Sequence, residues 1–391
     1  GGISTFVGLV TAGNVVSSGI ITAKAFIPSG GQLSNRNLIV NGAMKVAQYQ
    51  SGIGSTNATG YGRVDRFQCN YSGTDESPWS SQEALTSSDS GPWGEGFRHC
   101  MQILNGNQSG GAGADDYIRI YHNQEAQDLA ASGWDYTSAN SYITLSYWVR
   151  SSVAQTFYTQ FASFDGTRKM YYFSTALSAN TWTKVSHSLP GHADLSFDFN
   201  TAEGFYITWY MFRGTNNTGT VTANQWNTYS ASTLTPNQTS TWYTTDNSTF
   251  KLTGVQFEVG SVATPFEHRK FQDDLYNCQR YYQQVGTNSQ DGNFCIGASH
   301  LTSNGDQTRV GYFGQNNLRA TPTITKFGDG CKVIGAASKS YTAVLTIDDI
   351  NITYPSAYLQ FNANCADIGD NYEVVVVTNT VNGGIYISAE L

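Results

Sequence analysis

Charged side chains are scarce in this sequence, and so are prolines and basic clusters. Of the 391 residues only 13% are Asp, Glu, Lys or Arg, and 8 are Pro. The 21 Lys and Arg residues form no basic run, and the formal net charge is −8. Binding to the phosphates of a nucleic acid requires clustered positive charge. The composition therefore argues against a nucleic-acid partner.

Long hydrophobic runs are also missing. No apolar stretch approaches the roughly eighteen residues that a membrane-spanning helix needs. The first ten residues, GGISTFVGLV, lack the charged start and the cleavage pattern of a secretory signal peptide. We therefore expect no membrane insertion, and release by lysis rather than by secretion would fit this chain.

Cysteine is infrequent and widely spaced. The six cysteines lie at positions 69, 100, 278, 295, 331 and 365, with no Cys-x-x-Cys pair among them. A chain of this length can bury a core without disulfides, and a zinc site would need more closely paired ligands. The spacing predicts free, buried thiols that pack as small hydrophobic residues.

Aromatic, glycine and uncharged polar residues are what the sequence has in abundance. Aromatics reach 13% and Gly contributes 40 residues. Aromatic and β-branched residues suit the half-buried surface of a sheet, and glycine suits its turns. The composition is typical of a β-rich extracellular or particle-surface protein, and the length allows two or three domains.

A short repeat lies near the start of the sequence. Gly8-Leu9-Val10-Thr11-Ala12 recurs as Gly19-Ile20-Ile21-Thr22-Ala23, eleven residues later. Such a repeat cannot bury its own faces as a single chain, so it predicts an intertwined fibrous shaft over residues 1–33. An ordinary strand-turn-strand with chance similarity is the alternative. A linker is expected around Pro28-Ser29-Gly30-Gly31.

Evenly spaced strands without intervening helices follow over residues 34–264. In the clearest strand, 142–150, Ile143 and Leu145 share one face while Thr144 and Ser146 share the other. Further strands are expected at 117–121, 156–164, 169–174, 181–189, 204–213 and 250–258, with a brief helical turn at 125–131. This spacing predicts a two-sheet antiparallel sandwich, a jelly roll.

One amphipathic helix is predicted within residues 265–285. Pro265 and Glu267 suit the first turn of a helix. The apolar positions that follow form one stripe: Phe271, Leu275, Cys278 and Tyr282. A helix of about fifteen residues is marginal alone. We therefore expect the stripe to pack against its own sandwich or against the same helix of sister chains.

Strands resume after this helix and predict a second, smaller β-sandwich over residues 286–391. Seven strands are expected there, with turns such as Asn382-Gly383-Gly384. The expected fold is all-β: a short N-terminal fibrous β shaft, a jelly-roll sandwich, one short helix and a smaller C-terminal β-sandwich. The polar loops of the last domain, at 302–306 and 314–317, are candidates for a receptor-binding tip.

Several motifs of this sequence resemble those of phage tail fibres or tail receptor-binding proteins found in marine and cyanobacterial phages. The most specific is Val255-Gln256-Phe257-Glu258-Val259-Gly260-Ser261-Val262-Ala263-Thr264-Pro265-Phe266-Glu267-His268-Arg269, which continues into Cys278-Gln279-Arg280-Tyr281-Tyr282. The others are Asn37-Leu38-Ile39-Val40-Asn41-Gly42, Asp65-Arg66-Phe67, Ser146-Tyr147-Trp148-Val149-Arg150-Ser151, Thr181-Trp182, Leu318-Arg319-Ala320-Thr321-Pro322-Thr323 and Ile387-Ser388-Ala389-Glu390-Leu391. The resemblance extends over nearly the whole chain.

This resemblance implies a carbohydrate-binding-module-like jelly roll on a homotrimeric tail fibre of a virion. Its partners would be copies of itself, other phage tail proteins, and a host surface glycan or protein. The shared motifs are framework strands and turns, so they assign no ligand residues. A purely structural fibre or adaptor segment is the alternative.

Catalysis is the rival class of function, because some phage tail proteins degrade polysaccharide. Glycoside hydrolysis needs two carboxylates roughly 5 Å or 6.5 to 9.5 Å apart. The candidate pairs Asp115-Asp116, Asp273-Asp274 and Asp348-Asp349 are adjacent in sequence, so their side chains diverge on a strand or helix. No Gly-x-Ser-x-Gly nucleophile motif occurs. We therefore expect no enzyme and no catalytic residues.

Tryptophans in polar loops are the candidate ligand-binding residues. Five tryptophans lie in Gly-, Ser- or otherwise polar-flanked contexts: Trp79, Trp93, Trp134, Trp226 and Trp242. Trp148, Trp182 and Trp209 are expected within strands. An aromatic face with nearby polar groups is the usual arrangement for sugar recognition. We predict a site at Trp79 and Trp93, with Asp89 and Glu95 beside them; burial of each Trp under its own loop is the alternative.

No cofactor is expected, and a structural calcium ion is the open alternative. Jelly-roll binding modules often carry one, and acidic turns supply oxygen ligands. Asp115-Asp116 follows such a Gly-rich loop, but the sequence has no EF-hand-like spacing. No metal ligands are assigned.

Overall fold

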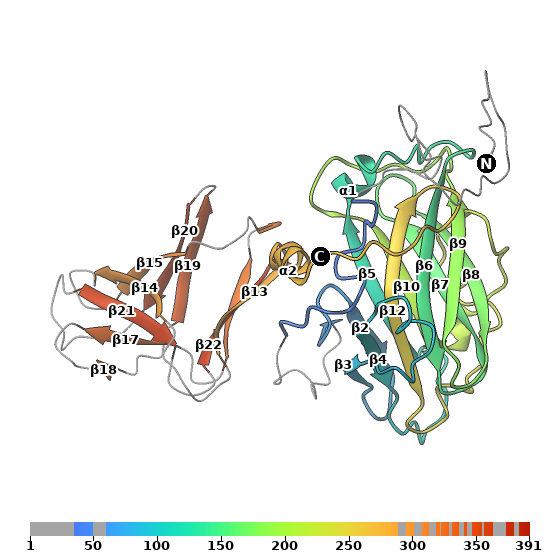
Figure 1. Ribbon diagram of the computed structural model, residues 1–391, viewed down its shortest axis with the longest axis horizontal. Helices are drawn as coiled ribbons and strands as arrows, with labels where there is room; N and C mark the ends of the chain where they lie inside the picture. The colour runs from blue at the N-terminus through green and yellow to red at the C-terminus, as the bar shows by residue number, and fades with distance from the viewer. Residues whose placement is uncertain are drawn as a thin grey trace, which may run out of the picture.

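The computed structural model describes most of the chain. Described are residues 35–49, 60–287, 295–300, 307–312, 318–320, 322–327, 331–335, 340–341, 346–353, 356–362, 373–378 and 383–391. The predicted shaft over residues 1–33 and the polar loops at 302–306 and 314–317 lie outside these residues. Within them the fold is all-β with two short α-helices, as predicted (Figure 1).

The larger module is an antiparallel two-sheet sandwich. Its seven-stranded sheet runs in the order β1 (Gly60–Tyr61), β2 (Gln68–Ser72), β5 (Tyr117–Glu125), β10 (Glu203–Arg213), β7 (Gln155–Ser163), β8 (Lys169–Leu177) and β11 (Asn227–Thr228). Its five-stranded sheet runs β3 (Trp79–Ala84), β4 (His99–Leu104), β12 (Thr249–Val259), β6 (Tyr142–Ser151) and β9 (Thr183–Pro190). The helical turn α1 (Ala126–Ala130) follows β5, and a 3₁₀ turn, η1 (Thr215–Asn217), follows β10.

Aromatic side chains from both sheets fill the space between them. Phe161 of β7 and Phe205 of β10 come from the seven-stranded sheet, and Phe257 of β12 comes from the opposite one; their ring centroids lie 5.8 to 6.0 Å apart. Trp209 is only 1% exposed. Burying a side chain of this size contributes about 1.5 to 3 kcal/mol. This aromatic layer holds the sheets face to face, as expected for a sandwich core.

A smaller β module follows α2 (Phe271–Gln279). A three-stranded sheet contains β13 (Tyr282–Thr287), β22 (Gly383–Ser388) and β16 (Thr323–Phe327). A four-stranded sheet contains β14 (Cys295–His300), β21 (Glu373–Thr378), β17 (Cys331–Gly335) and β18 (Ser340–Tyr341). A third contains β15 (Gln307–Tyr312), β20 (Ser356–Asn362) and β19 (Thr346–Thr353). All pairings in these sheets are antiparallel.

The helix between the modules is shorter than predicted. It begins at Phe271 rather than near Pro265, and Tyr282 lies in β13. The segment before it stays extended because Glu267 accepts the backbone N–H of Asn37 (2.9 Å) instead of capping a first turn. The four residues of the predicted stripe are therefore not buried together: Phe271 is 54% exposed, whereas Cys278 is 1% exposed.

The buried side of α2 contacts its own sandwich through polar groups. Asp274 is buried and pairs with Lys45, whose Nζ lies 2.9 Å from its carboxylate. Tyr282, just beyond the helix, stacks on Tyr49 with ring centroids 3.7 Å apart. The helix is thus anchored by an ion pair and a ring stack rather than by an apolar stripe alone.

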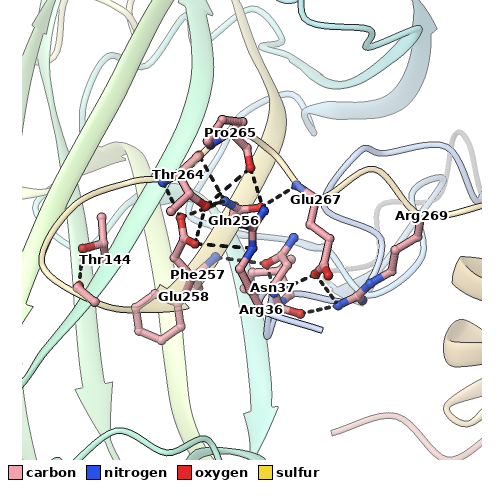
Figure 2. Close-up of polar contacts among 12 residues, drawn as sticks. Arg36, Asn37, Thr144, Gln256, Phe257, Glu258, Thr264, Pro265, Glu267 and Arg269 are labelled. Carbon is pink, nitrogen blue, oxygen red and sulfur yellow. Dashed lines mark hydrogen bonds and ion pairs between the residues drawn. The ribbon is translucent and has the colours of Figure 1, made fainter. Parts of the chain in front are cut away.

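A network centred on Asn37 joins the first described segment to β12 (Figure 2). The Asn37 side chain donates to the carbonyl of Val255 (3.1 Å) and accepts the N–H groups of Ile39 and Phe257 (both 3.0 Å). Arg269 then donates to the carbonyl oxygen of Asn37 (2.7 Å). Gly42 lies against the same strand, where an added Cβ would fall 2.0 Å from the carbonyl oxygen of Val255, so only glycine fits.

The continuation of β12 folds back onto the strand through a second set of hydrogen bonds. Glu258 accepts the N–H (2.8 Å) and the hydroxyl (2.6 Å) of Thr264, and Gln256 accepts the N–H of Glu267 (2.7 Å). Figure 2 shows these side chains converging between β12 and the segment that leads to α2. The most specific of the resemblance motifs is therefore a structural network, in which these polar side chains pair with one another.

The last described residues return to the larger sandwich. Arg66, 1% exposed, forms an ion pair with Glu390, and its guanidinium lies 3.5 Å from the ring centroid of Tyr281. The carbonyl oxygen of Leu391 accepts hydrogen bonds from Tyr61, Gln68 and Asn123 at 3.1 to 3.4 Å. The label C lies beside β5 in Figure 1, in agreement with these contacts.

Cysteine behaves as predicted in the described part of the chain. Cys69, Cys100 and Cys278 are free and buried. Burial raises the pKa of the Cys69 and Cys100 thiols to about 12, because the thiolate would lose its hydration. These thiols are inert packing residues.

Candidate functional site

Three of the four predicted ligand residues lie together on the outer face of the five-stranded sheet. Asp89, Trp93 and Glu95 belong to the loop between β3 and β4, and this loop contacts Trp148 of β6 and Trp182 before β9. We refer to these five residues as the tryptophan cluster. Trp79 is 43% exposed but lies at the other end of β3, opposite Leu104, so it does not join them.

The polar groups of the tryptophan cluster already have partners. The indole N–H of Trp148 donates to Glu95 (3.0 Å) and that of Trp182 donates to Asp89 (3.0 Å). Lys184 lies 2.7 Å from Glu95, and the guanidinium of Arg98 lies 3.7 Å from the ring centroid of Trp93. The cluster therefore fastens its loop to the sheet.

Both carboxylates of the tryptophan cluster stay ionised. Partial burial acts to raise the pKa of Asp89, but hydrogen bonds from Trp182 and Thr86 outweigh it, so the pKa lies below its usual range. The same balance holds for Glu95, where Lys184 and Trp148 stabilise the charge and lower the pKa. As acceptors in these bonds, the two groups have little capacity left for a ligand.

The remaining loop tryptophans follow the alternative of burial. Trp134, Trp226 and Trp242 are buried, and their indole N–H groups donate to carbonyl oxygens of Ser141, Pro190 and Thr249. Trp148 and Trp182, expected inside strands, are only partly buried. Polar flanking residues did not indicate exposure, because backbone carbonyls can satisfy a buried indole.

The outer face of the seven-stranded sheet carries a different set of side chains. Alternate residues of β5 point away from the core, and their partners in β2 and β10 share that face. Rings and guanidinium groups follow one another there in the order Arg213, Tyr117, Arg119, Tyr121, Tyr206, Arg168. We call these six residues the arginine–tyrosine ladder.

Distances between neighbouring groups show that the ladder is continuous. The Arg213 guanidinium lies 4.5 Å from the ring centroid of Tyr117, and the Arg119 guanidinium lies 5.4 Å from Tyr117 and 4.7 Å from Tyr121. The rings of Tyr121 and Tyr206 are 4.8 Å apart. At the far end Arg168 donates to the Tyr206 hydroxyl (3.0 Å).

Arg168 is held between further aromatic rings. Its guanidinium lies 3.7 Å from the ring centroid of Tyr229 and 4.3 Å from that of Phe164. Each such cation–π contact stabilises the charge by about 0.5 to 2 kcal/mol. The rings therefore fix the orientation of the guanidinium groups without neutralising them.

One carboxyl group accompanies the ladder. Glu203 accepts the hydroxyl of Tyr121 (2.8 Å). Burial raises the pKa of Glu203 to about 7, although the Tyr121 hydrogen bond and the charges of Arg168 and Arg119 oppose the shift. Glu203 is therefore partly protonated near neutral pH.

The ladder guanidinium groups lack carboxylate partners within the described residues. Arg66, Arg150 and Arg280 form ion pairs elsewhere. In contrast, among the residues that the structure describes, Arg119, Arg168 and Arg213 have no carboxylate within 4.0 Å. Arg119 and Arg168 instead donate hydrogen bonds to the hydroxyls of Tyr210 and Tyr206. The side-chain oxygen of Asn70, opposite Arg119 on β2, is unpartnered. The three arginine side chains are partly exposed, and a guanidinium group without a carboxylate partner at the surface is a candidate for binding a ligand.

A loop of the same chain covers the neighbouring part of this sheet. In residues 218–238, the carbonyl oxygens of Val221 and Pro236 accept the hydroxyls of Tyr172 and Tyr158. Leu234 packs in the same aromatic layer and is 3% exposed. This covering loop packs over β7 and β8 and over the rings of Tyr121 and Tyr206, which are buried in the same cluster. The other ladder residues, Tyr117, Arg119, Arg168 and Arg213, are partly exposed.

A pocket of about 490 Å³ lies elsewhere, between residues 35–40, α1 and the end of α2. Its polar lining is mostly paired: Arg280 bonds Glu125 through two nitrogens (both 2.8 Å), and the Tyr281 hydroxyl bonds the same carboxylate (2.7 Å). Asn37 has its side chain engaged with β12. The pocket therefore presents fewer free groups than the ladder.

The pair Asp115-Asp116 has hydrogen-bond partners within its own chain. Asp116 accepts the N–H of Gly113 (2.6 Å) and the Tyr243 hydroxyl (3.0 Å), while Asp115 accepts from Asn216 (2.9 Å). Two donors aimed at one carboxylate oxygen leave poor access for a calcium ion. Over the part of the chain that the structure describes, no group of three or more His, Cys, Asp or Glu side chains gathers around a common point.

The sequence of β5 contains a pattern that is consistent with the ladder. In Tyr117-Ile118-Arg119-Ile120-Tyr121 the isoleucines alternate with Tyr and Arg, and the structure places the isoleucines in the core. The pattern predicted a strand but did not indicate that its polar side would meet Tyr206 and Arg168. That juxtaposition depends on the pairing of β5, β10 and β7, which are distant in sequence.

In the described residues no helix is both long enough and apolar enough to cross a bilayer. Comparison with protein-family models and with curated protein sequences gives no match.

Solved structures give distant likenesses. The enzymatically active domain of tailspike protein 4 from bacteriophage CBA120 matches with a TM-score of 0.30 and 9% identity, over 57% of this chain and 21% of that one. The tandem CBM22-1–CBM22-2 domain of Xyn10C from Paenibacillus barcinonensis matches with a TM-score of 0.25 and 10% identity, over 82% of this chain and 93% of that one. The N-terminal cellulose-binding domain of β-1,4-glucanase C from Cellulomonas fimi matches with a TM-score of 0.24 and 11% identity, over 42% and 80%. At such low scores these likenesses assign no ligand or activity to this chain.

Proposed function

We propose that this protein binds glycans of a host cell surface, and that the arginine–tyrosine ladder is the binding face. The observation that carries the proposal is the row of three guanidinium groups, held by aromatic rings and lacking carboxylate partners among the described residues. Guanidinium N–H groups can donate to sugar hydroxyls, and the partly exposed ring of Tyr117 can contact the apolar side of a pyranose. The role proposed is binding without catalysis.

The biological setting that we propose is a phage tail fibre that attaches the virion to its host. The motifs that resemble tail receptor-binding proteins support this setting, and a homotrimer with further tail proteins as partners belongs to the same proposal. A purely structural fibre segment is the competing function. Competition between the purified protein and phage for host cells distinguishes the two, because a structural segment would leave adsorption unchanged.

Binding to a glycan array tests the ligand class. We expect the double substitution Arg119→Ala and Arg168→Ala to reduce binding by at least tenfold, because it removes two charged donors. Trp79→Ala is a matched control, since Trp79 is exposed and distant from the ladder. Equal loss in the control, or full binding by the double variant, would contradict the assignment.

The same array tests the tryptophan cluster, which was the site predicted from the sequence. Trp93→Ala should leave glycan binding within about twofold of the unmodified protein if the cluster only fastens its loop. Loss of binding in a Trp93→Ala protein that remains folded would place the ligand there instead. Release of oligosaccharides from host polysaccharide that depends on one Asp or Glu would overturn the proposal of binding without catalysis.

A further inference from the structure

We infer that the ligand of the ladder is an acidic polysaccharide, one that carries carboxylate or sulfate groups along its chain. This inference rests on the proposed glycan-binding function and specifies the chemical class of the ligand. It follows from the charge of the face, the pairing of its guanidinium groups and the way in which they are oriented.

The charge of the ladder differs in sign from that of the whole protein. The chain has a formal net charge of −8. The ladder brings together Arg119, Arg168 and Arg213, and the carboxyl group that accompanies them is Glu203. Asp116 lies near the Arg213 end, but its carboxylate accepts hydrogen bonds from Gly113 and Tyr243. A positive face on an acidic protein attracts anionic ligands locally.

The guanidinium groups of the ladder carry a free-energy cost as long as they have no counter-ion. Arginine remains protonated at any working pH, so a partly buried guanidinium without a counter-ion carries a desolvation cost. Carboxylate and sulfate oxygens match the planar donor set of arginine and form stronger hydrogen bonds than neutral hydroxyls. A neutral glycan would satisfy the donors only partly, whereas an acidic one supplies the missing charge.

The aromatic rings orient these groups toward a repeating ligand. Tyr117, Tyr121 and Tyr206 separate the guanidinium groups along the face, so the positive charges follow one another at intervals rather than forming a single cluster. A polymer with a charged group on successive sugars offers the same kind of spacing. A single phosphate or a small anion would engage only one of these positions.

The probe for this inference is a polyuronate, compared with the same polymer after reduction of its carboxyl groups to alcohols. We expect the purified protein to bind the polyuronate at least tenfold more tightly than the reduced polymer, with affinity that falls as salt rises. Arg119→Gln with Arg168→Gln should reduce polyuronate binding at least tenfold. Arg98→Gln, at the tryptophan cluster, is the control and should bind as the unmodified protein does.

The outcomes separate this inference from the function on which it rests. Tight binding of the reduced polymer, lost in the double variant, would overturn the acidic ligand and keep glycan binding. Binding of neither polymer nor any glycan on the array would overturn the proposed function. Tighter binding of single-stranded DNA than of polyuronate would identify the face as a nucleic-acid surface. If the double variant unfolds, Arg119→Lys provides the test, because it keeps the charge and loses the planar fork.

Discussion

Glu203 shows how one side chain can change the properties of a surface. It lies beside Tyr121, and Arg119 and Arg168 act on it through their charges. Burial raises its pKa to about 7. Below that pH the group is neutral and the ladder carries its full positive charge. Above it, an ionised Glu203 lowers the positive charge of the face.

Binding of an acidic glycan should therefore weaken as pH rises from about 6 to 8. The reason is that deprotonation of Glu203 places a negative charge next to the ligand. Affinity for a polyuronate measured across this range should fall in the unmodified protein and stay nearly constant in Glu203→Gln. A pH dependence that persists unchanged in Glu203→Gln would show that another group controls binding.

Asp65 makes a second prediction at the scale of one residue. Burial raises its pKa to about 7, although hydrogen bonds from Gln48 favour the charged form. Nearby Glu390 acts to raise the pKa further and Arg66 to lower it. Because the folded pKa lies above the unfolded value of 3.8, the contribution of Asp65 to stability is present at low pH and is lost as pH rises from about 4 to 7.

Urea unfolding at several pH values measures this contribution. Between about pH 4 and 7 the free energy of unfolding of Asp65→Asn should fall less, or rise more, than that of the unmodified protein. The comparison of slopes matters rather than the absolute stability, since the amide also changes the hydrogen bonds to Gln48. Parallel curves for the two proteins would mean that Asp65 is ionised throughout.

At the scale of elements, strand periodicity was sufficient for much of the fold. The alternation of Ile143 and Leu145 with Thr144 and Ser146 predicted β6, and spacing without helices predicted the sandwich. The start of α2 could not be predicted in the same way. Pro265 and Glu267 suited a helix locally, but Glu267 has a stronger partner in Asn37, which is 230 residues away. Long-range hydrogen bonds therefore decided where the helix begins.

The candidate site was less accessible to sequence reasoning. The clustering of Asp89, Trp93 and Glu95 was predicted, but the partners that occupy them come from β6 and β9. The ladder requires three strands in a particular register. The local sequence indicates which neighbouring residues lie close together. Which residues meet on one face of a sheet depends on the order and register of strands that are distant in sequence.

Asn37 should be the residue on which the connection to β12 depends most. Asn37→Ala leaves the N–H groups of Ile39 and Phe257 and the carbonyl of Val255 unpaired in a buried position. We expect a loss of about 2 to 4 kcal/mol in the free energy of unfolding. Asn140→Ala, at an exposed turn, should change it by about 0.5 kcal/mol or less. Similar values for both variants would contradict the role given to the Asn37 network.

At the scale of the whole molecule, α2 is only partly covered by its own sandwich. Asp274 and Cys278 are buried, whereas Phe271 and Tyr276 are each 54% exposed. An exposed phenylalanine on a helix between two modules suits contact with a second copy of the chain. Leu275 lies between these extremes, partly buried.

The proposed homotrimer can be tested by substitutions in α2. Leu275→Asp or Phe271→Asp should lower the mass measured in solution from that of a trimer, because a charge would enter the interface. A nearly unchanged melting temperature in these variants would show that the fold survives. Val262→Asp serves as a control, because Val262 is another exposed apolar residue. A trimer that persists in both helix variants would mean that α2 packs only within its own chain.

The ion pair between Arg66 and Glu390 joins residues that are 324 positions apart. On a ribosome that adds about 5 to 20 residues per second, Arg66 would emerge roughly 15 to 65 seconds before its partner is made. Throughout that interval the sandwich would hold a buried guanidinium without its counter-charge. The nascent larger module should therefore remain loosely closed at this edge, open to chaperones and proteases, until Glu390 is synthesised and docks against it.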